Sequence, residues 1–503
     1  MTEDIMKLSE NPEKFLSMLK KGDIRVSIHG QGYVGLPLSI LFAIKGIKVV
    51  GVSKDKKAIE KIQKGESPID ETDPNSLLGQ GAKEINQKCT IDGVNLFEYE
   101  SHTFCPMCLR CFDIVENIPI IKHETVNLRG KLKTLTDYLK EALDSGNYEL
   151  TDDNIEATKK TDIHIITVPT YADDYSIVLK VCEDIAKGLQ KDGDVIINKS
   201  TVPVGATDEA DALMKKNTDK KFGICHMQER IAEGRALKDF QELPRTVGSN
   251  SKDANIIAKV LFEILGAPVF MFDSPKVTEA SKVFENSYRD CNIGIANDYA
   301  MFCEKHGLDV YQVINAANTL PKTRIFQPGM VGGHCLPEDT YYVANPMKDE
   351  LKEKNVIMAG RKMNEQVPFH SIELLKKGLN EAGIAIKGSK VCLYGVAFKG
   401  NTDDTRLTGA KIIADELKKN GIEVYVYDPW VPEEAQKDFG NPVEFEKSLN
   451  LEAVIIATDH TEFYSIDFSK GNYKVLVDMR NITEDLEKIK KSGKIVLKYG
   501  VGK

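Results

Sequence analysis

The sequence predicts an α/β protein in which two doubly wound units are joined by a long central helix. A buried strand, a glycine-rich turn and a helix follow one another from Ile24, and a second alternation of strands and helices begins at Lys390. Between them the pattern becomes helical from about residue 274. We therefore expect a first α/β domain at 1–273 with a cysteine-rich insert at about 72–130, a central helical region at 274–385 and a second α/β domain at 386–503.

The composition is that of a water-soluble globular protein. The 503 residues are 42% hydrophobic and 28% charged, and the net charge of −9 argues against a broad basic face for nucleic acid. No apolar run approaches the roughly 20 residues of a membrane span, and the acidic N-terminus does not resemble a secretory signal. We expect a cytoplasmic protein whose ten cysteines are reduced, bind metal or take part in catalysis.

The first glycine-rich turn has the pattern G-x-G-x-x-G. Its glycines are Gly30, Gly32 and Gly35, and they lie between a predicted strand and a predicted helix. In this context the glycines allow a tight turn, and the N–H groups of the helix N-terminus face a pyrophosphate. The sequence therefore predicts a Rossmann-like domain that binds a dinucleotide.

The residues after the second strand leave the choice of dinucleotide open. An acidic residue normally holds the ribose hydroxyls near position 53, where this chain has Ser53. Asp55 is one substitute, which favours NAD. Ser53 and the neighbouring lysines would instead suit the 2′-phosphate of NADP.

Polar residues follow two further predicted strands, and a third polar site comes after them. Thr170 and Thr201 lie at the ends of the two strands, and Glu229 and Arg230 form the third site. The carboxyl ends of strands form the ligand crevice of an open α/β sheet. These side chains are therefore candidates for cofactor or substrate binding, although the hydroxyls could equally cap helices.

The central helical region carries a polar row. Lys282, Asn286, Arg289 and Asp290 are spaced so that they lie along one helix face. Apolar residues continue beyond them, which predicts a long helix buried on several sides, with a second subunit as one candidate for its cover. The small residues Gly294 and Ala296 permit close packing.

The strongest candidate for chemistry is Cys335. It follows Gly332, Gly333 and His334, and Asp339 lies four residues further on. The glycines let the backbone approach a ligand closely, and a thiolate is a good nucleophile. The alternative is a buried cysteine beside a glycine turn, which is how most single cysteines behave.

Two further segments suggest ligands. The insert contains a C-x₂-C-x₂-C run and one more cysteine, which would suit tetrahedral zinc, an iron–sulfur centre or no metal at all: Cys89, Cys105, Cys108 and Cys111. In the second α/β domain, Lys399 and Arg406 flank a predicted helix start. That arrangement suits a phosphorylated ligand, and the alternative is a surface loop of balanced charge.

Taken together, these motifs resemble the UDP-glucose/GDP-mannose dehydrogenase family. The resemblance covers nearly the whole chain except the N-terminal extension and the insert. It depends on segments that occur in one order: Gly30–Pro37, Gly65–Ile69, Val168–Thr170, Ser200–Gly205, Glu229–Arg230, Lys282–Asn286, Gly332–Asp339 and Phe398–Arg406.

The resemblance implies a four-electron oxidation of a C6 alcohol to a carboxylate with two NAD(P)⁺. Cys335 would hold the aldehyde as a thiohemiacetal and then as a thioester. Lys282 would stabilise the oxyanion, Asn286 would hold the sugar or the oxyanion, and Asp339, Glu229 and Thr201 would transfer protons. The implied cofactor residues are Gly30, Gly32, Tyr33, Val34, Gly35, Ser53, Asp55, Thr170 and Thr201. The implied substrate residues are Glu229, Arg230, Lys282, Asn286, Arg289, Gly332, Lys399 and Arg406.

The resemblance also implies a homodimer or higher oligomer, a UDP-sugar substrate and a place in polysaccharide biosynthesis. Residues Glu285–Asp290 and Gly332–Cys335 are similar to the branch that acts on UDP-N-acetylhexosamines, especially UDP-N-acetyl-D-mannosamine, whereas Leu336–Thr340 is closer to the UDP-glucose branch. The competing interpretations are a UDP-glucose 6-dehydrogenase and a nucleotide-sugar sensor with a metal-binding insert.

Overall fold

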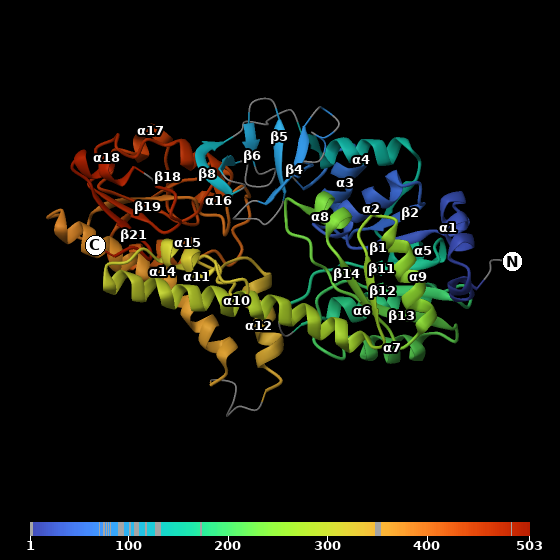
Figure 1. Cartoon of the computed structure of the whole chain (residues 1–503). Coiled ribbons are helices and arrows are strands. Elements are labelled where there is room, and N and C mark those ends of the chain that lie inside the picture. The colour runs from blue at the N-terminus through green and yellow to red at the C-terminus, as the bar shows by residue number, and fades with distance from the viewer. Residues whose placement is uncertain are drawn as a thin grey trace. The chain divides into compact units, whose positions relative to one another are not determined.

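The computed structural model divides into two compact units (Figure 1). The first comprises residues 1–85, 97–101 and 127–284, and the second comprises residues 86–96, 102–126 and 285–503. The residues described are 4–69, 71–73, 76, 78, 80, 82–88, 95–99, 102–104, 110–115, 118–125, 132–171, 174–347, 354–483 and 485–502.

An eight-stranded sheet forms the centre of the first unit. Its order is β10-β2-β1-β11-β12-β13-β14-β15, and all neighbours are parallel except β13 and β14. The order reverses direction at β1, which creates the crevice in which such sheets bind dinucleotides. The strands are β1 (Val26–His29), β2 (Val49–Val52), β10 (Tyr148–Thr151), β11 (Ile163–Ile166), β12 (Asp194–Asn198), β13 (Phe222–Met227), β14 (Arg245–Gly248) and β15 (Val269–Phe272).

Helices cover this sheet and bury an apolar core. The N-terminal segment belongs to this core, because Phe15 and Leu19 are buried in it with Ile28 and Phe42. The helices are η1 (Ile5–Glu10), α1 (Pro12–Lys21), α2 (Gly35–Ile44), α3 (Lys56–Gln63), α4 (Leu135–Asp144), α5 (Asn154–Lys159), α6 (Ser176–Gly188), α7 (Ala206–Asn217), α8 (Ala236–Glu242) and α9 (Lys252–Glu263).

The predicted insert contains two small sheets. β3 (Thr72–Asp73) pairs with β9 (Lys133–Thr134), and a five-stranded sheet has the order β4-β5-β6-β7-β8. Its strands are β4 (Lys83–Lys88), β5 (Asn95–Tyr99), β6 (His102–Phe104), β7 (Arg110–Val115) and β8 (Ile118–Thr125). Of the predicted metal ligands, Cys89, Cys105 and Cys108 lie outside the described residues, and Cys111 lies in β7 opposite Phe104. The described part of the chain contains no group of three or more candidate metal ligands.

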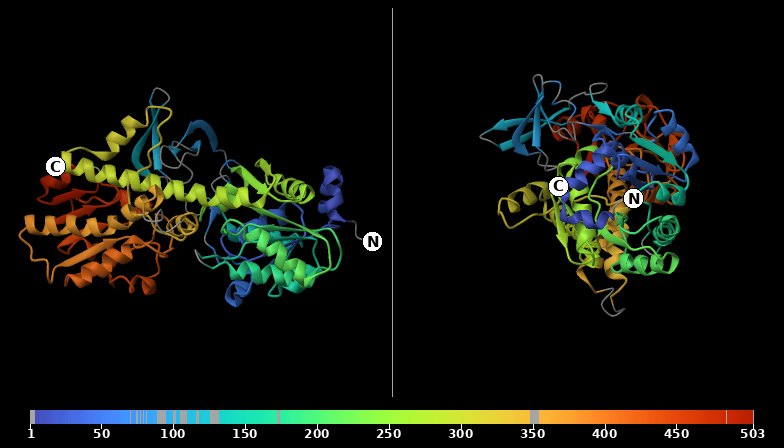
Figure 2. Two further views of the ribbon diagram at one scale, coloured as in Figure 1. Left: turned by 90° about the horizontal axis from the view of Figure 1, so that it is seen from below. Right: turned by 90° about the vertical axis from the view of Figure 1, so that its right-hand side faces the viewer.

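The second unit contains a parallel sheet with the order β18-β17-β16-β19-β20-β21. The strands are β16 (Lys390–Tyr394), β17 (Glu423–Tyr427), β18 (Asn441–Pro442), β19 (Ala453–Ile456), β20 (Val475–Asp478) and β21 (Ile495–Lys498). Helices α14 (Val356–Glu381) and α15 (Gly409–Lys419) pack against it (Figure 2). The remaining helices of this sheet region are α16 (Glu433–Gln436), α17 (Phe445–Ser448), η3 (Thr461–Ser465) and α18 (Leu486–Lys491).

The predicted long central helix is confirmed. Helix α10 (Pro275–His306) ends before Gly307, whose φ of 69° is left-handed, and α11 (Val310–Ala317) begins after the N-cap Asp309. Gly294 fits the expected close packing, because a Cβ there would lie 2.6 Å from the Cα of Gly360 on α14. Among the described residues, no helix has both the length and the apolar composition needed to cross a bilayer.

Buried histidines should make the first unit sensitive to acid. Burial lowers the pKa of His29 and of His226 to about 3 each. Between pH 6.5 and that value the unfolded chain binds protons that the folded protein does not bind. The free energy of unfolding should therefore fall as the pH drops below 6.5, by up to about 1.4 kcal/mol per pH unit for each histidine.

Urea unfolding from about pH 7.5 to about pH 5 measures this slope. We expect His226→Gln to reduce the slope of the unfolding free energy against pH by the contribution of one histidine. The exposed control His306→Gln should leave that slope unchanged. An unchanged slope in His226→Gln would contradict the assignment.

Candidate active site

The glycine-rich turn lies between β1 and α2 and has the geometry that a dinucleotide requires. Gly30 has a φ of 104°, and a Cβ on Gly35 would lie 1.8 Å from the carbonyl oxygen of Gly30. A Cβ on Gly32, in contrast, would meet nothing within 4 Å. Two of the glycines are therefore needed for packing and the third faces open space, where a pyrophosphate would fit. The side chain of Tyr33 beside it is exposed, and Val34 is the N-cap of α2.

Ser53 and Asp55 both lie just beyond β2, at the edge where a ribose would bind. Ser53 is buried, and its Oγ accepts a hydrogen bond from the N–H of Asp55. The carboxylate of Asp55 is exposed and caps α3 by accepting the N–H groups of Lys57 and Ala58. An exposed carboxylate therefore stands near the expected position, two residues later than in the usual pattern.

Thr170 and Thr201 join two strand ends. The hydroxyl of Thr170 donates a hydrogen bond of 2.7 Å to the carbonyl oxygen of Thr201. The loops after β11 and β12 are therefore fastened to each other at the carboxyl edge of the sheet. This contact brings the two predicted threonines together.

Glu229 forms a buried ion pair that sequence reasoning missed. The Nζ of Lys199, at the end of β12, lies 3.1 Å from the Oε2 of Glu229, at the end of β13, and the lysine is fully buried. Burial alone would raise the pKa of Glu229, but Lys199, the N–H of Ile231 and Arg245 hold that pKa below its usual range. Burial lowers the pKa of Lys199, against the attraction of Glu229. The pair thus keeps a carboxylate ionised in the interior.

Two other predicted residues of the first unit surround this pair. Lys282, on α10, lies near enough to Lys199 and His226 to lower the pKa of each, a smaller effect than that of burial. Arg230 is half-buried and donates a hydrogen bond to the carbonyl oxygen of Pro244. Positive charge therefore gathers around the Glu229 carboxylate.

In the second unit, Asn286 meets Asp339. The Nδ2 of Asn286 on α10 donates a 2.5 Å hydrogen bond to Oδ2 of Asp339 on α12 (Cys335–Ala344), and both residues are buried. The predicted shared face is correct for Asn286 and Asp290, but Arg289 is exposed. The buried face of the helix also includes Val283 and Ser287, so Arg289 lies at its edge.

Cys335 is the first residue of α12 and is exposed, so the alternative of a buried packing cysteine is wrong. The N–H groups of a first helical turn favour a thiolate. The preceding glycines are required by contacts: a Cβ on Gly332 would lie 2.7 Å from the carbonyl oxygen of Leu407, and Gly333 has a φ of 77° beside the ring of Phe398. The Nε2 of His334 lies 3.1 Å from the Oε2 of Glu338, one helical turn further on.

Lys399 and Arg406 occupy the loop between β16 and α15. Arg406 binds the carboxylate of Asp404 through Nε and a terminal nitrogen, and its side chain is half exposed. The Nζ of Lys399 lies 5.6 Å from the ring centroid of Phe398. The expectation that these two residues flank a helix start is wrong, because α15 begins at Gly409 after the cap Thr408.

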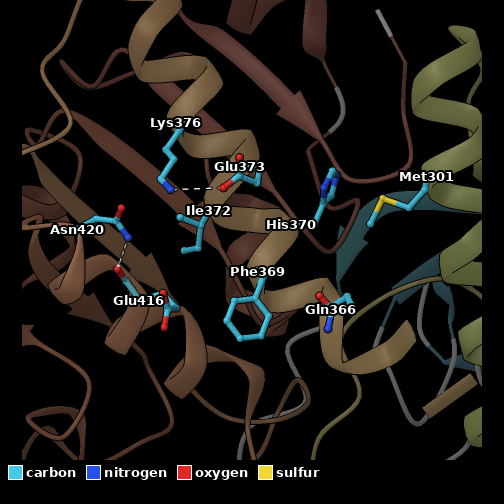
Figure 3. Close-up of a pocket in the computed structure, with 9 residues that line it drawn as sticks. All are labelled: Met301, Gln366, Phe369, His370, Ile372, Glu373, Lys376, Glu416 and Asn420. Carbon is cyan, nitrogen blue, oxygen red and sulfur yellow. Dashed lines mark hydrogen bonds and ion pairs between the residues drawn. The ribbon is translucent and has the colours of Figure 1, made fainter. Parts of the chain in front are cut away.

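A surface pocket of about 300 Å³ lies elsewhere in the second unit (Figure 3). Its lining includes Met301, Phe369, His370 and Lys376, and none of the predicted site residues. It is therefore separate from the candidate active site.

Comparison with known proteins identifies the family. Three domain profiles of one family match the chain: an NAD binding domain at residues 24–102 and 117–266, a central domain at 276–366 and a UDP binding domain at 392–485. The chain belongs to the UDP-glucose/GDP-mannose dehydrogenase family. It is therefore an oxidoreductase with an NAD-binding and a UDP-binding domain. Within the predicted insert, only residues 103–116 are unmatched, and they contain Cys105, Cys108 and Cys111.

Individual members are similar over nearly the full length. The chain is 29% identical to the UDP-N-acetyl-D-mannosamine dehydrogenase of Pyrococcus horikoshii, over 92% of this chain and 96% of the relative. It is also 29% identical to a UDP-N-acetyl-D-glucosamine 6-dehydrogenase of Salmonella typhi, over 88% and 91%. The solved structure of the Pyrococcus horikoshii UDP-D-ManNAc dehydrogenase aligns with a TM-score of 0.73 at 28% identity, covering 95% of this chain and 99% of that one.

Proposed function

We propose that the protein oxidises the C6 alcohol of UDP-N-acetyl-D-mannosamine to the uronate, with two NAD⁺ per sugar. The observation that carries this proposal is an exposed cysteine at the N-terminus of α12, the helix whose buried Asp339 accepts a hydrogen bond from Asn286 on α10. The substrate rests on similarity to relatives named as dehydrogenases of UDP-N-acetyl-D-mannosamine and UDP-N-acetyl-D-glucosamine.

The chemistry needs a nucleophile because the first oxidation gives an aldehyde, which must be kept for the second. The thiolate of Cys335 adds to the aldehyde carbon, and the resulting thiohemiacetal loses a second hydride to become a thioester. Water then attacks the thioester and releases the carboxylate and the thiol. NAD⁺, when bound, supplies the hydride acceptor in both oxidations.

Polar residues stabilise the oxyanion, transfer protons and bind the substrate. Lys282 stabilises the developing oxyanion, and Asn286 donates to the same oxygen or to the sugar. Asp339, Glu229 and Thr201 move protons through water. Arg230, Arg289, Gly332, Lys399 and Arg406 bind the UDP-sugar.

The cofactor is held by the turn from Gly30 to Gly35, with Tyr33 and Val34 beside it. Thr170 and Thr201 complete that pocket at the adjoining strand ends. Asp55 supports NAD as the preferred form, because its exposed carboxylate at the edge of β2 would repel the 2′-phosphate of NADP.

The reaction itself provides the first test. We expect two reduced cofactors per UDP-N-acetylmannosamine consumed and a uronate product. Cys335→Ala should lower uronate formation about a thousandfold or more, because the covalent intermediate cannot form. The matched control is Cys291→Ala, a half-buried thiol in the same unit, which should keep normal turnover.

Unchanged uronate formation by Cys335→Ala would refute the covalent mechanism. One reduced cofactor per sugar would show that the aldehyde is released. Turnover of UDP-glucose alone would keep the mechanism and change the substrate.

Lys199 should control the pH dependence of the reaction. Without its cation, burial raises the pKa of Glu229, so the loss of activity on the acid side should begin at a higher pH in Lys199→Met. Lys199→Arg should restore much of the profile, and Lys215→Met, an exposed ion-paired lysine, is the control. The measurement is kcat against pH by NADH absorbance. If kcat fell at the same acidic pH in Lys199→Met as in the unaltered enzyme, Lys199 would not control the ionisation of Glu229.

The oligomer is a second part of the proposal. Tyr288, Ile295, Tyr299 and Phe302 are 40–56% exposed and recur at helical spacing on α10, which makes one apolar stripe. We propose that this stripe forms a homodimer. Sedimentation should give a dimer, and Tyr299→Asp with Phe302→Asp should give a monomer. A monomeric unaltered protein would exclude the dimer.

Zinc in the insert remains a prediction at Cys89, Cys105, Cys108 and Cys111. The zinc and iron content of the purified protein, together with thiol titration of the insert, decides it.

A further inference from the structure

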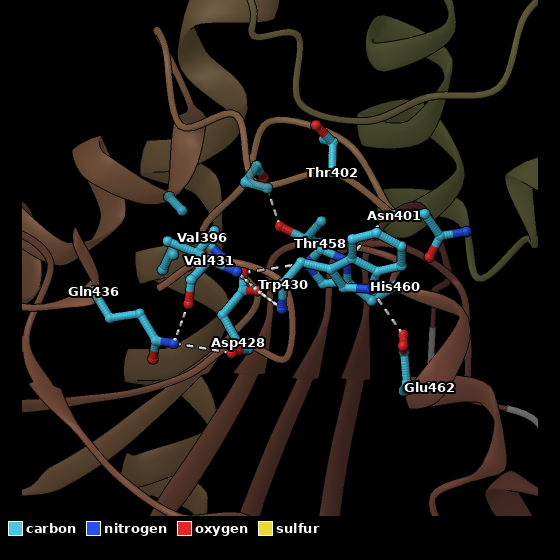
Figure 4. Close-up of polar contacts among 12 residues, drawn as sticks. Val396, Asn401, Thr402, Asp428, Trp430, Val431, Gln436, Thr458, His460 and Glu462 are labelled. Carbon is cyan, nitrogen blue, oxygen red and sulfur yellow. Dashed lines mark hydrogen bonds and ion pairs between the residues drawn. The ribbon is translucent and has the colours of Figure 1, made fainter. Parts of the chain in front are cut away.

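Three loops meet at the carboxyl edge of the second sheet, and a buried histidine and aspartate connect them (Figure 4). Asp428 follows β17 and His460 lies four residues beyond β19. The Nε2 of His460 is 3.1 Å from Oδ2 of Asp428, and both side chains are fully buried. Neither residue belongs to the proposed catalytic or substrate-binding set.

The carboxylate of Asp428 is the fixed centre of this cluster. It accepts the N–H groups of Val396 at 2.7 Å, Trp430 at 2.8 Å and Val431 at 2.9 Å. Burial would raise the pKa of Asp428, but His460 and these N–H donors hold it below its usual range. The aspartate is therefore an ionised anchor, and the ring nitrogen of His460 that faces it donates.

The other ring nitrogen of His460 reaches the loop between β16 and α15. Its Nδ1 accepts a 3.0 Å hydrogen bond from the N–H of Asn401. Asn401 has a φ of 59°, a left-handed conformation that asparagine adopts more often than most other non-glycine residues. Its side chain also exchanges two hydrogen bonds with Thr461, one to the hydroxyl and one from the N–H. The cluster thus holds Asn401 through both its backbone and its side chain.

The same loop supports the segment that carries Cys335. The N–H of Gly333 donates a 3.1 Å hydrogen bond to the carbonyl oxygen of Arg406, and Gly333 lies against the ring of Phe398. Lys399, next to Phe398, and Arg406 are the proposed ligands of the diphosphate. One loop, fixed at Asn401, therefore carries the proposed nucleotide contacts and the backbone support of the nucleophile.

We propose that His460, oriented by Asp428, is a positioning residue. It fixes the conformation of the loop of residues 398–406, so that this loop binds the nucleotide diphosphate and supports the Cys335 segment. This inference rests on the proposed function. His460 does not touch the reacting atoms, and it acts through the N–H of Asn401.

The sole tryptophan of the chain gives this cluster its own optical reporter. The ring of Trp430 is parallel to that of His460 within 9°, with centroids 6.3 Å apart, and its Nε1 donates to Glu462. Its fluorescence therefore reports on the environment of His460 in the full-length protein.

The first test measures the loop without any ligand. In His460→Leu, the amide of Asn401 loses its acceptor, so residues 398–406 should exchange hydrogen for deuterium about tenfold faster or more, the factor expected for loss of about one hydrogen bond. His460→Gln can still donate to Asp428 and accept from Asn401, and it should restore most of the protection. The matched control is His370→Leu, whose histidine pairs with Glu304 elsewhere in the same unit. Equal protection of the loop in His460→Leu and the unaltered protein would overturn the inference.

The second test measures the nucleotide. UDP should change the Trp430 fluorescence of the unaltered enzyme, and its Kd should rise about tenfold in His460→Leu but less than about threefold in His460→Gln and His370→Leu. Because the loop also supports the Cys335 segment, both KM for the UDP-sugar and kcat should worsen in His460→Leu, whereas KM for NAD⁺ should not.

The two tests separate two kinds of failure. If the unaltered enzyme bound no UDP, the proposed function would be refuted. The hydrogen–deuterium exchange of residues 398–406 needs no ligand and would still test the positioning role. An enzyme that binds and oxidises UDP-sugars equally well with His460→Leu would refute the positioning role alone. If His460→Leu does not fold, Asp428→Asn with the same measurements takes its place, and normal loop protection and UDP affinity there would refute the inference.

Discussion

The carboxylate of Asp290 holds together the three helices on which the reactive cysteine depends. It accepts hydrogen bonds from Arg361 at 2.8 Å, Asn364 at 2.8 Å and Thr340 at 3.2 Å. These partners lie on α14 and α12, while Asp290 lies on α10. Burial raises the pKa of Asp290 against the pull of Arg361, so the charge is kept there only because its partners are in place. The position of α12, and of Cys335 at its start, is thus fixed by a buried polar interaction.

The first unit also depends on a buried charge that is kept by its partner. Lys199 and Glu229 lie at the ends of neighbouring strands, and removal of one partner would leave a buried charge at a cost of about 3–5 kcal/mol. Replacement of both by apolar residues would be far less costly. A structural role alone would therefore not require this pair, whereas a carboxylate that must stay ionised away from water does require a nearby cation.

Local patterns predicted the elements well and the contacts poorly. The turn at Gly30–Gly35, the strands around it and the second α/β unit were all predicted, because strand, glycine and helix signals are short-range. Lys199 was missed because its partner is distant in sequence, and periodicity carries no information about pairing. The exposure of Arg289 was not predicted, because a helix face predicted from spacing has no defined edge until the neighbouring helices are known.

Distance along the chain also explains why the sequence alone did not predict two residue pairs. Asn286 and Asp339 are 53 residues apart, and Asn401 and His460 are 59 apart. Each pair consists of polar groups that are costly to bury unless they are matched, so a fold selected for stability alone would have little reason to place them inside. Both pairs lie in the second unit: one joins α10 to α12, the helix of Cys335, and the other holds the loop that supports the glycines before Cys335. We infer that these polar pairs hold the reactive groups in position, and local sequence patterns do not reveal such contacts.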